Sequence, residues 1–144
     1  MLARPLLALV LLTACGSEGP PPNVILVSID TLRADHVGLY GYARDTTPFL
    51  DDFAKTAMVF EHAFSVCPWT LVAHMTMLTG LFPAQHGVVA DQLALSQEIP
   101  LLPERLASAG YQTLGLYYTS WIHERYGFAR GFDVFRAHES AEEA

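Results

Sequence analysis

The chain has 144 residues, of which 51% are hydrophobic and 16% are charged, a composition that indicates a folded globular protein and excludes a disordered one. Its formal net charge of −7, with no basic run, argues against a protein that binds nucleic acid. The negative net charge does not exclude small anionic substrates, because a bound cation can dominate the local electrostatic field of a site.

The first fifteen residues read as a targeting segment and not as part of the fold. Arg4 precedes a wholly apolar run, residues 6–12, which is too short to span a bilayer. The run closes with Leu-Thr-Ala-Cys at Cys15, an ending similar to the lipobox of bacterial lipoproteins. We expect Cys15 to be acylated and to anchor the protein to a membrane of the bacterial cell envelope, on its periplasmic or extracellular face. The alternative is an ordinary secretory signal with an incidental cysteine.

Three segments follow from this division of the chain: a signal peptide and lipobox at 1–15, a tether at 16–22 and a globular part at 23–144. The tether has the sequence GSEGPPP, flexible at first and stiffer at its prolines. If Cys15 is acylated, Cys67 has no partner within the chain, and we expect it to be a buried free thiol.

A continuous apolar run, residues 23–29, opens the globular part. It is rich in β-branched residues and lies between Pro22 and Asp30, which predicts a strand buried on both faces of a parallel sheet. Asp30 then stands at the carboxyl end of that strand, where open α/β sheets bind ligands. An aspartate there can also be a simple cap for the next segment.

The next hundred residues alternate between helix and strand patterns. Residues 32–42 predict an irregular loop with a helical turn, and residues 46–57 a helix with Pro48 in its first turn. Residues 58–64 predict a second strand. A helix over 101–109 and a third strand over 111–118 follow. This alternation indicates an α/β domain with a largely parallel sheet.

The central stretch, CPWTLVAHMTMLTG at 67–80, predicts a helix over 70–79 with Gly80 as its stop. Leu71, Met75 and Leu78 recur at helical spacing as an apolar stripe. Thr70 and His74 lie one turn apart on a second face. At the positive end of the helix the Thr70 hydroxyl could be held as an alkoxide or receive an anionic ester, but a threonine at this place can also be only an N-cap.

Together with NVILVSIDTLRADHVGLYGY at 23–42 and LTGLFPAQHGV at 78–88, this stretch resembles the N-terminal part of sulfatases, in the alkaline phosphatase superfamily. The resemblance runs from about residue 22 to residue 135. It implies an α/β/α sandwich, of which the chain holds the N-terminal portion. It also makes Asp30 the first metal-binding acid, places Thr31 at the second acid position and marks His86 as a secondary site candidate.

The nucleophile position departs from the sulfatase signature. In the family a Cys-x-Pro-Ser-Arg run carries a cysteine that is oxidised to formylglycine. Counting back from Leu-Thr-Gly at 78–80 places Thr70 at that position, with Val72 and His74 where the proline and the arginine would be. Related branches of the superfamily use an unmodified threonine, so no formylglycine is expected at Thr70 or at Cys67.

The function that the resemblance implies is metal-dependent hydrolysis of sulfate, phosphate or phosphonate esters. Asp30 and Thr70 would bind a divalent metal (Ca²⁺, Mg²⁺, Mn²⁺ or Zn²⁺), Thr70 would attack, and His74 would bind the ester or its leaving group. His74 could instead be a half-exposed histidine without such a role. The family's later Asp-His/Asn-Gly motif does not occur in the sequence, so we expect only the nucleophile half of a site. The alternative is a truncated, catalytically inactive lipoprotein or binding protein.

Overall fold

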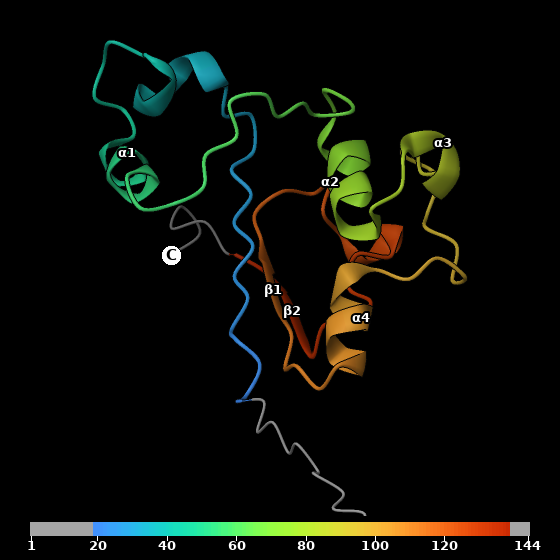
Figure 1. Ribbon diagram of the computed structural model, residues 1–144. Helices are drawn as coiled ribbons and strands as arrows, with labels where there is room; N and C mark the ends of the chain where they lie inside the picture. The colour runs from blue at the N-terminus through green and yellow to red at the C-terminus, as the bar shows by residue number, and fades with distance from the viewer. Residues whose placement is uncertain (1–18, 139–144) are drawn as a thin grey trace, which may run out of the picture.

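The computed structural model describes residues 19–138, so Cys15 and the first three residues of the tether lie outside the described residues. Four α-helices and two β-strands succeed one another there, with two short 3₁₀-helices before α1 and a third between β1 and β2 (Figure 1). In chain order these elements are α1 (Pro48–Ala54), α2 (Thr70–Thr79), α3 (Pro83–His86), α4 (Leu102–Ser108), β1 (Leu114–Tyr117) and β2 (Val134–Ala137). Within residues 19–138 no helix is long and apolar enough to cross a membrane.

Helix α2 has the bounds that the sequence predicts. The chain enters it in an extended conformation at Trp69 and leaves it at Gly80, whose φ of 71° is left-handed. The Gly80 N–H donates to the carbonyl oxygen of Thr76 at 2.8 Å, which satisfies one of the last free carbonyls of the helix. The helix is therefore defined by local chemistry at both of its ends.

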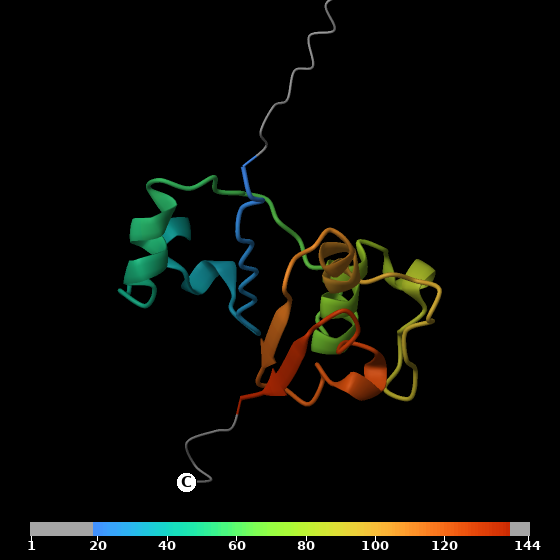
Figure 2. The ribbon, with the colours of Figure 1, turned by 90° about the horizontal axis from the view of Figure 1, so that it is seen from below.

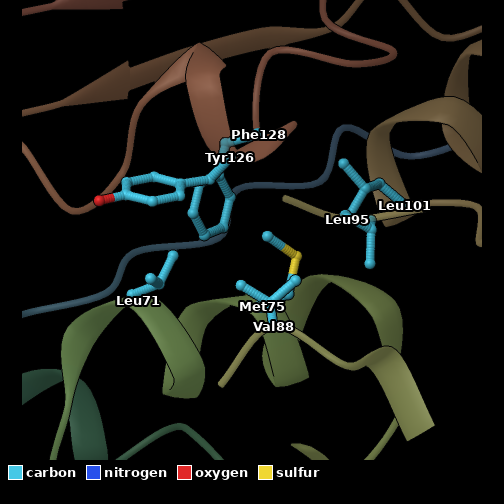
Figure 3. Packing of buried hydrophobic residues seen from close by; sticks show 7 residues of the cluster. All are labelled: Leu71, Met75, Val88, Leu95, Leu101, Tyr126 and Phe128. Atoms are coloured by element: carbon cyan, nitrogen blue, oxygen red, sulfur yellow. The ribbon is translucent and has the colours of Figure 1, made fainter. Parts of the chain in front are cut away.

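A single apolar cluster holds α2 against the C-terminal half of the chain (Figure 3). Leu71 and Met75 project from α2 and are fully buried, as the apolar stripe predicts. They pack with side chains from four later segments: Val88, Leu95, Leu101, Tyr126 and Phe128. Each side chain buried in this way contributes about 1.5–3 kcal/mol, so the cluster fixes the orientation of α2 and of the polar face that it carries.

The two strands form a small parallel sheet (Figure 2). The predicted strand over 111–118 is confirmed at Leu114–Tyr117, and its register pairs Leu114 with Val134. Strand β2 was not predicted, because residues 134–137 are too few to show a pattern. The parallel pair and the helices agree with an α/β class, of which the described residues form one part.

The first predicted strand is wrong in its burial and its pairing. Residues 23–29 are extended and run beside β1 in Figures 1 and 2, but they form no regular strand. Every one of them is exposed, with Ile25 at 85% and Val27 at 74%. The apolar pattern predicts an extended conformation, and the segment is extended. Burial on both faces would also need covering elements, which residues 19–138 do not supply.

The predicted strand over 58–64 is wrong as well. These residues form bends and irregular chain, and Phe64 is 87% exposed. Their loose alternation of apolar residues has no neighbouring strand to pair with in the described part of the chain, and isolated strands are not stable in water. The predicted helices over 46–57 and 101–109 are confirmed as the shorter α1 and α4.

The exposed segment 23–29 leads to a prediction about association. An extended apolar segment with unpaired backbone groups is a template for pairing between molecules. We expect the full chain to self-associate and the double variant Ile25→Lys/Val27→Lys to be more monomeric, measured by light scattering at equal concentration. Circular dichroism of the variant should be unchanged, since neither side chain is in the core. Equal self-association of the two proteins would contradict the prediction.

Candidate active site

Thr70 and Asp30, forty residues apart in sequence, meet at the start of α2. The Thr70 Oγ1 hydroxyl donates to the Asp30 carboxylate, at 3.0 Å from Oδ2 and 3.3 Å from Oδ1. The N-cap position belongs to Trp69, so Thr70 is the first residue of the helix and its side chain does not cap it. The hydroxyl therefore donates to the carboxylate of Asp30 and does not cap the helix, and the interpretation of Thr70 as only an N-cap is wrong.

The position of Thr70 favours negative charge on its oxygen. The first turn of a helix presents backbone N–H groups without intrahelical partners, and the helix dipole is positive there. A ten-residue helix such as α2 carries this effect, and no side chain caps its first turn. An alkoxide on Thr70, or an anionic ester bound to it, would thus be stabilised by the helix, while Asp30 can accept the hydroxyl proton.

His74 lies one turn further along α2 and is bound on both sides of its ring. Its Nδ1 is 2.9 Å from the carbonyl oxygen of Thr70, and its Nε2 is 2.8 Å from the hydroxyl oxygen of Ser28. His74 itself is half-buried, and Ser28 is exposed. The imidazole is therefore held beside the Thr70–Asp30 pair by contacts from both α2 and the extended segment.

Asp30 pairs with Thr70 and Ser28 pairs with His74. Both pairs can form because the distance from Ser28 to Asp30 along the extended chain matches the distance from Thr70 to His74 along the helix. Two residues of extended chain, from Ser28 to Asp30, cover about 6.6 Å. Four residues of helix, from Thr70 to His74, rise about 6 Å. Ser28 was not predicted as a site residue, although its place two positions before Asp30, on the same side of an extended chain, is the signal that could have identified it.

A cavity of about 660 Å³ opens between the extended segment, α2, α4 and β1. Ser28, Asp30 and His74 contribute polar groups to its wall, while most other lining residues are apolar, among them Leu106 and Leu116. Thr70 does not line this cavity, but it is bonded to Asp30, which does. An apolar space with a few convergent polar groups is typical of a small-molecule site.

Thr31, the residue at the family's second acid position, has an unusual backbone. Within residues 19–138 it is the single non-glycine residue with a positive φ, at 58°. A β-branched residue in this conformation costs on the order of 1–3 kcal/mol, and such strain is commonly found at functional sites. The turn at Thr31 ends the extended segment directly after Asp30, so the carboxylate stands at a sharply defined chain reversal.

His86 lies apart from the Thr70–Asp30 pair. It is 3% exposed, and its ring bonds to the Thr76 hydroxyl at 3.0 Å and to the backbone N–H of Val88 at 3.1 Å. Because an N–H can only donate, Nδ1 of His86 is the acceptor and Nε2 carries the proton. These bonds join α2 to the end of α3, which is the role of a structural histidine.

Burial lowers the pKa of His86 below its usual value, and a pH-dependent stability follows. As the pH falls from about 6.5 toward the folded-state pKa, the unfolded chain binds the proton more readily than the folded one, so the free energy of unfolding falls. We expect this decline in urea titrations and expect it to be smaller in His86→Asn, whose side-chain oxygen can still accept from Val88. An equal decline in both proteins would assign the effect to other groups.

The cations that follow the third predicted strand do not reach Thr70 and Asp30 in the structure. Arg130 donates to Glu104 Oε2 at 2.8 Å and to the carbonyl oxygens of Ser96 and Ile99. Arg125 lies over the ring of Tyr126, with its guanidinium carbon 4.5 Å from the ring centroid. Both side chains are thus engaged in the C-terminal half of the fold.

The described residues do not complete a metal site. Asp30 and Thr70 place one carboxylate and one hydroxyl together, and within residues 19–138 no three His, Cys, Asp or Glu side chains gather so that they could hold a metal ion. Divalent metals need several oxygen or nitrogen donors. Within residues 19–138 Cys67 has no disulfide partner, and it is half-buried and not fully buried as expected.

The family model for sulfatases matches residues 22–144. The chain is 31% identical over 130 residues to an ulvan-active sulfatase of Formosa agariphila, covering 85% of this chain and 25% of that protein. It is 30% identical over 147 aligned positions to an N-acetylgalactosamine-6-sulfatase of Rattus norvegicus, covering 92% of this chain and 28% of that protein.

A bis(5'-adenosyl)-triphosphatase of Pongo abelii is 35% identical over 78 residues, covering 54% of this chain and 16% of that protein. No solved structure matches the chain. The chain spans about a quarter of the length of the sulfatases that it matches. The family match covers nearly the whole globular part and includes the Asp30 and Thr70 segments: the chain belongs to the sulfatase family.

Proposed function

We propose that the chain carries the nucleophile half of an ester hydrolase that acts on sulfate, phosphate or phosphonate esters, with Thr70 as the nucleophile. The observation that supports this function is the hydrogen bond from Thr70 Oγ1 to the Asp30 carboxylate at the positive end of α2. A hydroxyl, a proton acceptor and a helix N-terminus together are the groups that activate an oxygen nucleophile.

In the proposed reaction Thr70 Oγ1 attacks the sulfur or phosphorus atom of the ester and gives its proton to Asp30. A bond forms between Oγ1 and that atom, the bond to the ester oxygen breaks, and the leaving group departs with the electron pair. Water or another acceptor then releases the covalent threonine ester. A sulfated threonine is hard to release without the formylglycine route, which we do not expect here, so phosphorus esters are favoured beside sulfate esters. The bis(5'-adenosyl)-triphosphatase relative supports that wider substrate range.

His74 and a metal would complete this chemistry. The His74 imidazole lines the cavity next to Asp30, so it is placed beside the ester or its leaving group. Sulfatases generally use a metal ion, and the oxygens of Asp30 and Thr70 are the donors that this chain would offer to Ca²⁺, Mg²⁺, Mn²⁺ or Zn²⁺, with Thr31 as a weaker further donor. The further donors that a divalent metal needs are not gathered around this pair within residues 19–138.

One observation favours a second function, that of an inactive lipoprotein or binding protein. Two oxygen donors are too few for a catalytic metal, and the chain matches about a quarter of its sulfatase relatives. The two functions are separated by assays with aryl sulfates and aryl phosphates in the presence of each of the four metals. We expect no turnover by the chain alone, and turnover when residues 22–144 replace the matching quarter of the ulvan-active sulfatase. A joined protein that is folded but inactive would favour the binding function.

Membrane attachment is part of the proposal and rests on Cys15. Acylation of that cysteine would bind the protein to a bacterial envelope membrane, because acyl chains contribute about 0.8 kcal/mol for each buried CH₂ group. We expect the full chain to sediment with membranes and Cys15→Ser to appear mostly in the soluble fraction after removal of the signal peptide. A processed Cys15→Ser protein that stays with the membrane would count against lipidation.

A further inference from the structure

We propose that the Thr70 carbonyl holds His74 as the Nδ1–H tautomer, and that Ser28 is a positioning residue that donates to Nε2 of this ring at the cavity wall. The geometry of the ring carries this assignment. A backbone carbonyl can only accept, so the 2.9 Å contact between His74 Nδ1 and the Thr70 oxygen requires a proton on Nδ1. In the neutral ring Nε2 then has a lone pair and no proton, and the Ser28 hydroxyl, 2.8 Å away, must be the donor.

The second histidine against α2 has the opposite assignment. The Val88 N–H donates to Nδ1 of His86, so Nε2 of His86 carries the proton and donates to the Thr76 hydroxyl. The buried His86 is closed off by these bonds. His74 instead shares the cavity wall with Ser28 and Asp30. The two rings thus form a contrasting pair within one protein, and His86 is an internal control for any measurement on His74.

The Nδ1–H tautomer limits what His74 can do in the proposed reaction, and this part of the inference rests on the proposed function. A neutral His74 has its single N–H committed to the Thr70 carbonyl, so it has no proton to give to an ester oxygen. The Nε2 lone pair, which accepts from Ser28 in this structure, is the group of the ring that can accept a proton from a hydroxyl or a water molecule. His74 is therefore suited to orient the water that releases the threonine ester, and Ser28 keeps Nε2 aimed at that space until the water takes its place.

The tautomer is tested by ¹⁵N NMR of histidine-labelled full chain at a pH where both rings are neutral. We expect His74 to show a protonated Nδ1 and an unprotonated Nε2, and His86 to show the reverse. The measurement needs no metal, substrate or turnover, so its outcome is independent of whether the chain is a hydrolase. A His74 ring protonated at Nε2 would overturn the proposal.

The role of Ser28 is tested by the rate at which diethyl pyrocarbonate modifies each histidine, read by mass spectrometry on dilute protein. This reagent attacks an unprotonated ring nitrogen. Ser28→Ala should speed modification of His74 about fivefold, the factor for the loss of one ordinary hydrogen bond, and leave the rate at His86 unchanged. Ser28→Thr keeps the hydroxyl and should match the wild type. An unchanged rate at His74 in Ser28→Ala, or equal acceleration at both histidines, would overturn the assigned role.

Discussion

Replacing Thr70 by alanine is expected to lower turnover of aryl phosphates and aryl sulfates by about 10³-fold or more in the joined protein, in which residues 22–144 are linked to the remainder of the ulvan-active sulfatase. The variant has no oxygen at the start of α2, so no covalent ester can form and the Asp30 carboxylate loses its donor. The measurement is kcat and KM at saturating metal. The effect should fall on kcat, because the lost group acts in the bond-making step.

Thr70→Ser is the matched control for this prediction. Serine keeps a hydroxyl that can donate to Asp30 and should retain substantial turnover, while circular dichroism should show equal helix content in all three proteins. Thr70 is half-buried and lies outside the apolar cluster, so neither change should unfold the chain. Turnover that persists in Thr70→Ala at the wild-type level would show that another group is the nucleophile or that a contaminating hydrolase is present.

The parts of the site that the sequence predicts are those defined by local chemistry. Helix α2 was predicted to the residue, because its apolar stripe and Gly80 both act within a few residues of one another. Asp30 follows directly after an apolar run, which places it at the end of an extended segment. The meeting of Asp30 with Thr70 was expected from the resemblance to sulfatases, which implies that both residues bind one metal.

Ser28 could not be identified in the same way. A single serine inside an apolar run reads as a tolerated core residue, and its bond to His74 depends on how the extended segment docks on α2. That docking joins residues 46 positions apart, and nothing in the local pattern specifies it. Likewise, an apolar pattern shows that residues 23–29 are extended but not which elements cover them.

Side chains of a catalytic or binding type are often engaged in structural hydrogen bonds that only the three-dimensional structure shows. His86 was a secondary site candidate, yet its ring bonds to the Thr76 hydroxyl of α2 and to the Val88 N–H. Arg130 is engaged as well, because it ties Glu104 to the loop before α4. Sequence spacing therefore overestimates the number of groups that are free to meet a substrate.

Gly131→Ala is expected to destabilise the chain by about 3 kcal/mol or more, because it combines two separate costs. The φ of Gly131 is +78°, a left-handed conformation that costs an alanine about 1–2 kcal/mol. An added Cβ would also lie 2.2 Å from the backbone nitrogen of Glu104 and 2.6 Å from its Cα. These atoms belong to the first turn of α4, so the helix must move, and the neighbouring bond between Arg130 and Glu104 is strained with it.

Gly110→Ala separates the two costs of that substitution. Gly110 also has a left-handed φ, +88°, but nothing lies within 4 Å of a Cβ added there. Its alanine variant should lose only the conformational part, about 1–2 kcal/mol. The free energy of unfolding in urea, measured for the wild type and both variants, gives the difference. A loss in Gly131→Ala no larger than that in Gly110→Ala would show that the turn at Gly131 does not pack tightly against α4.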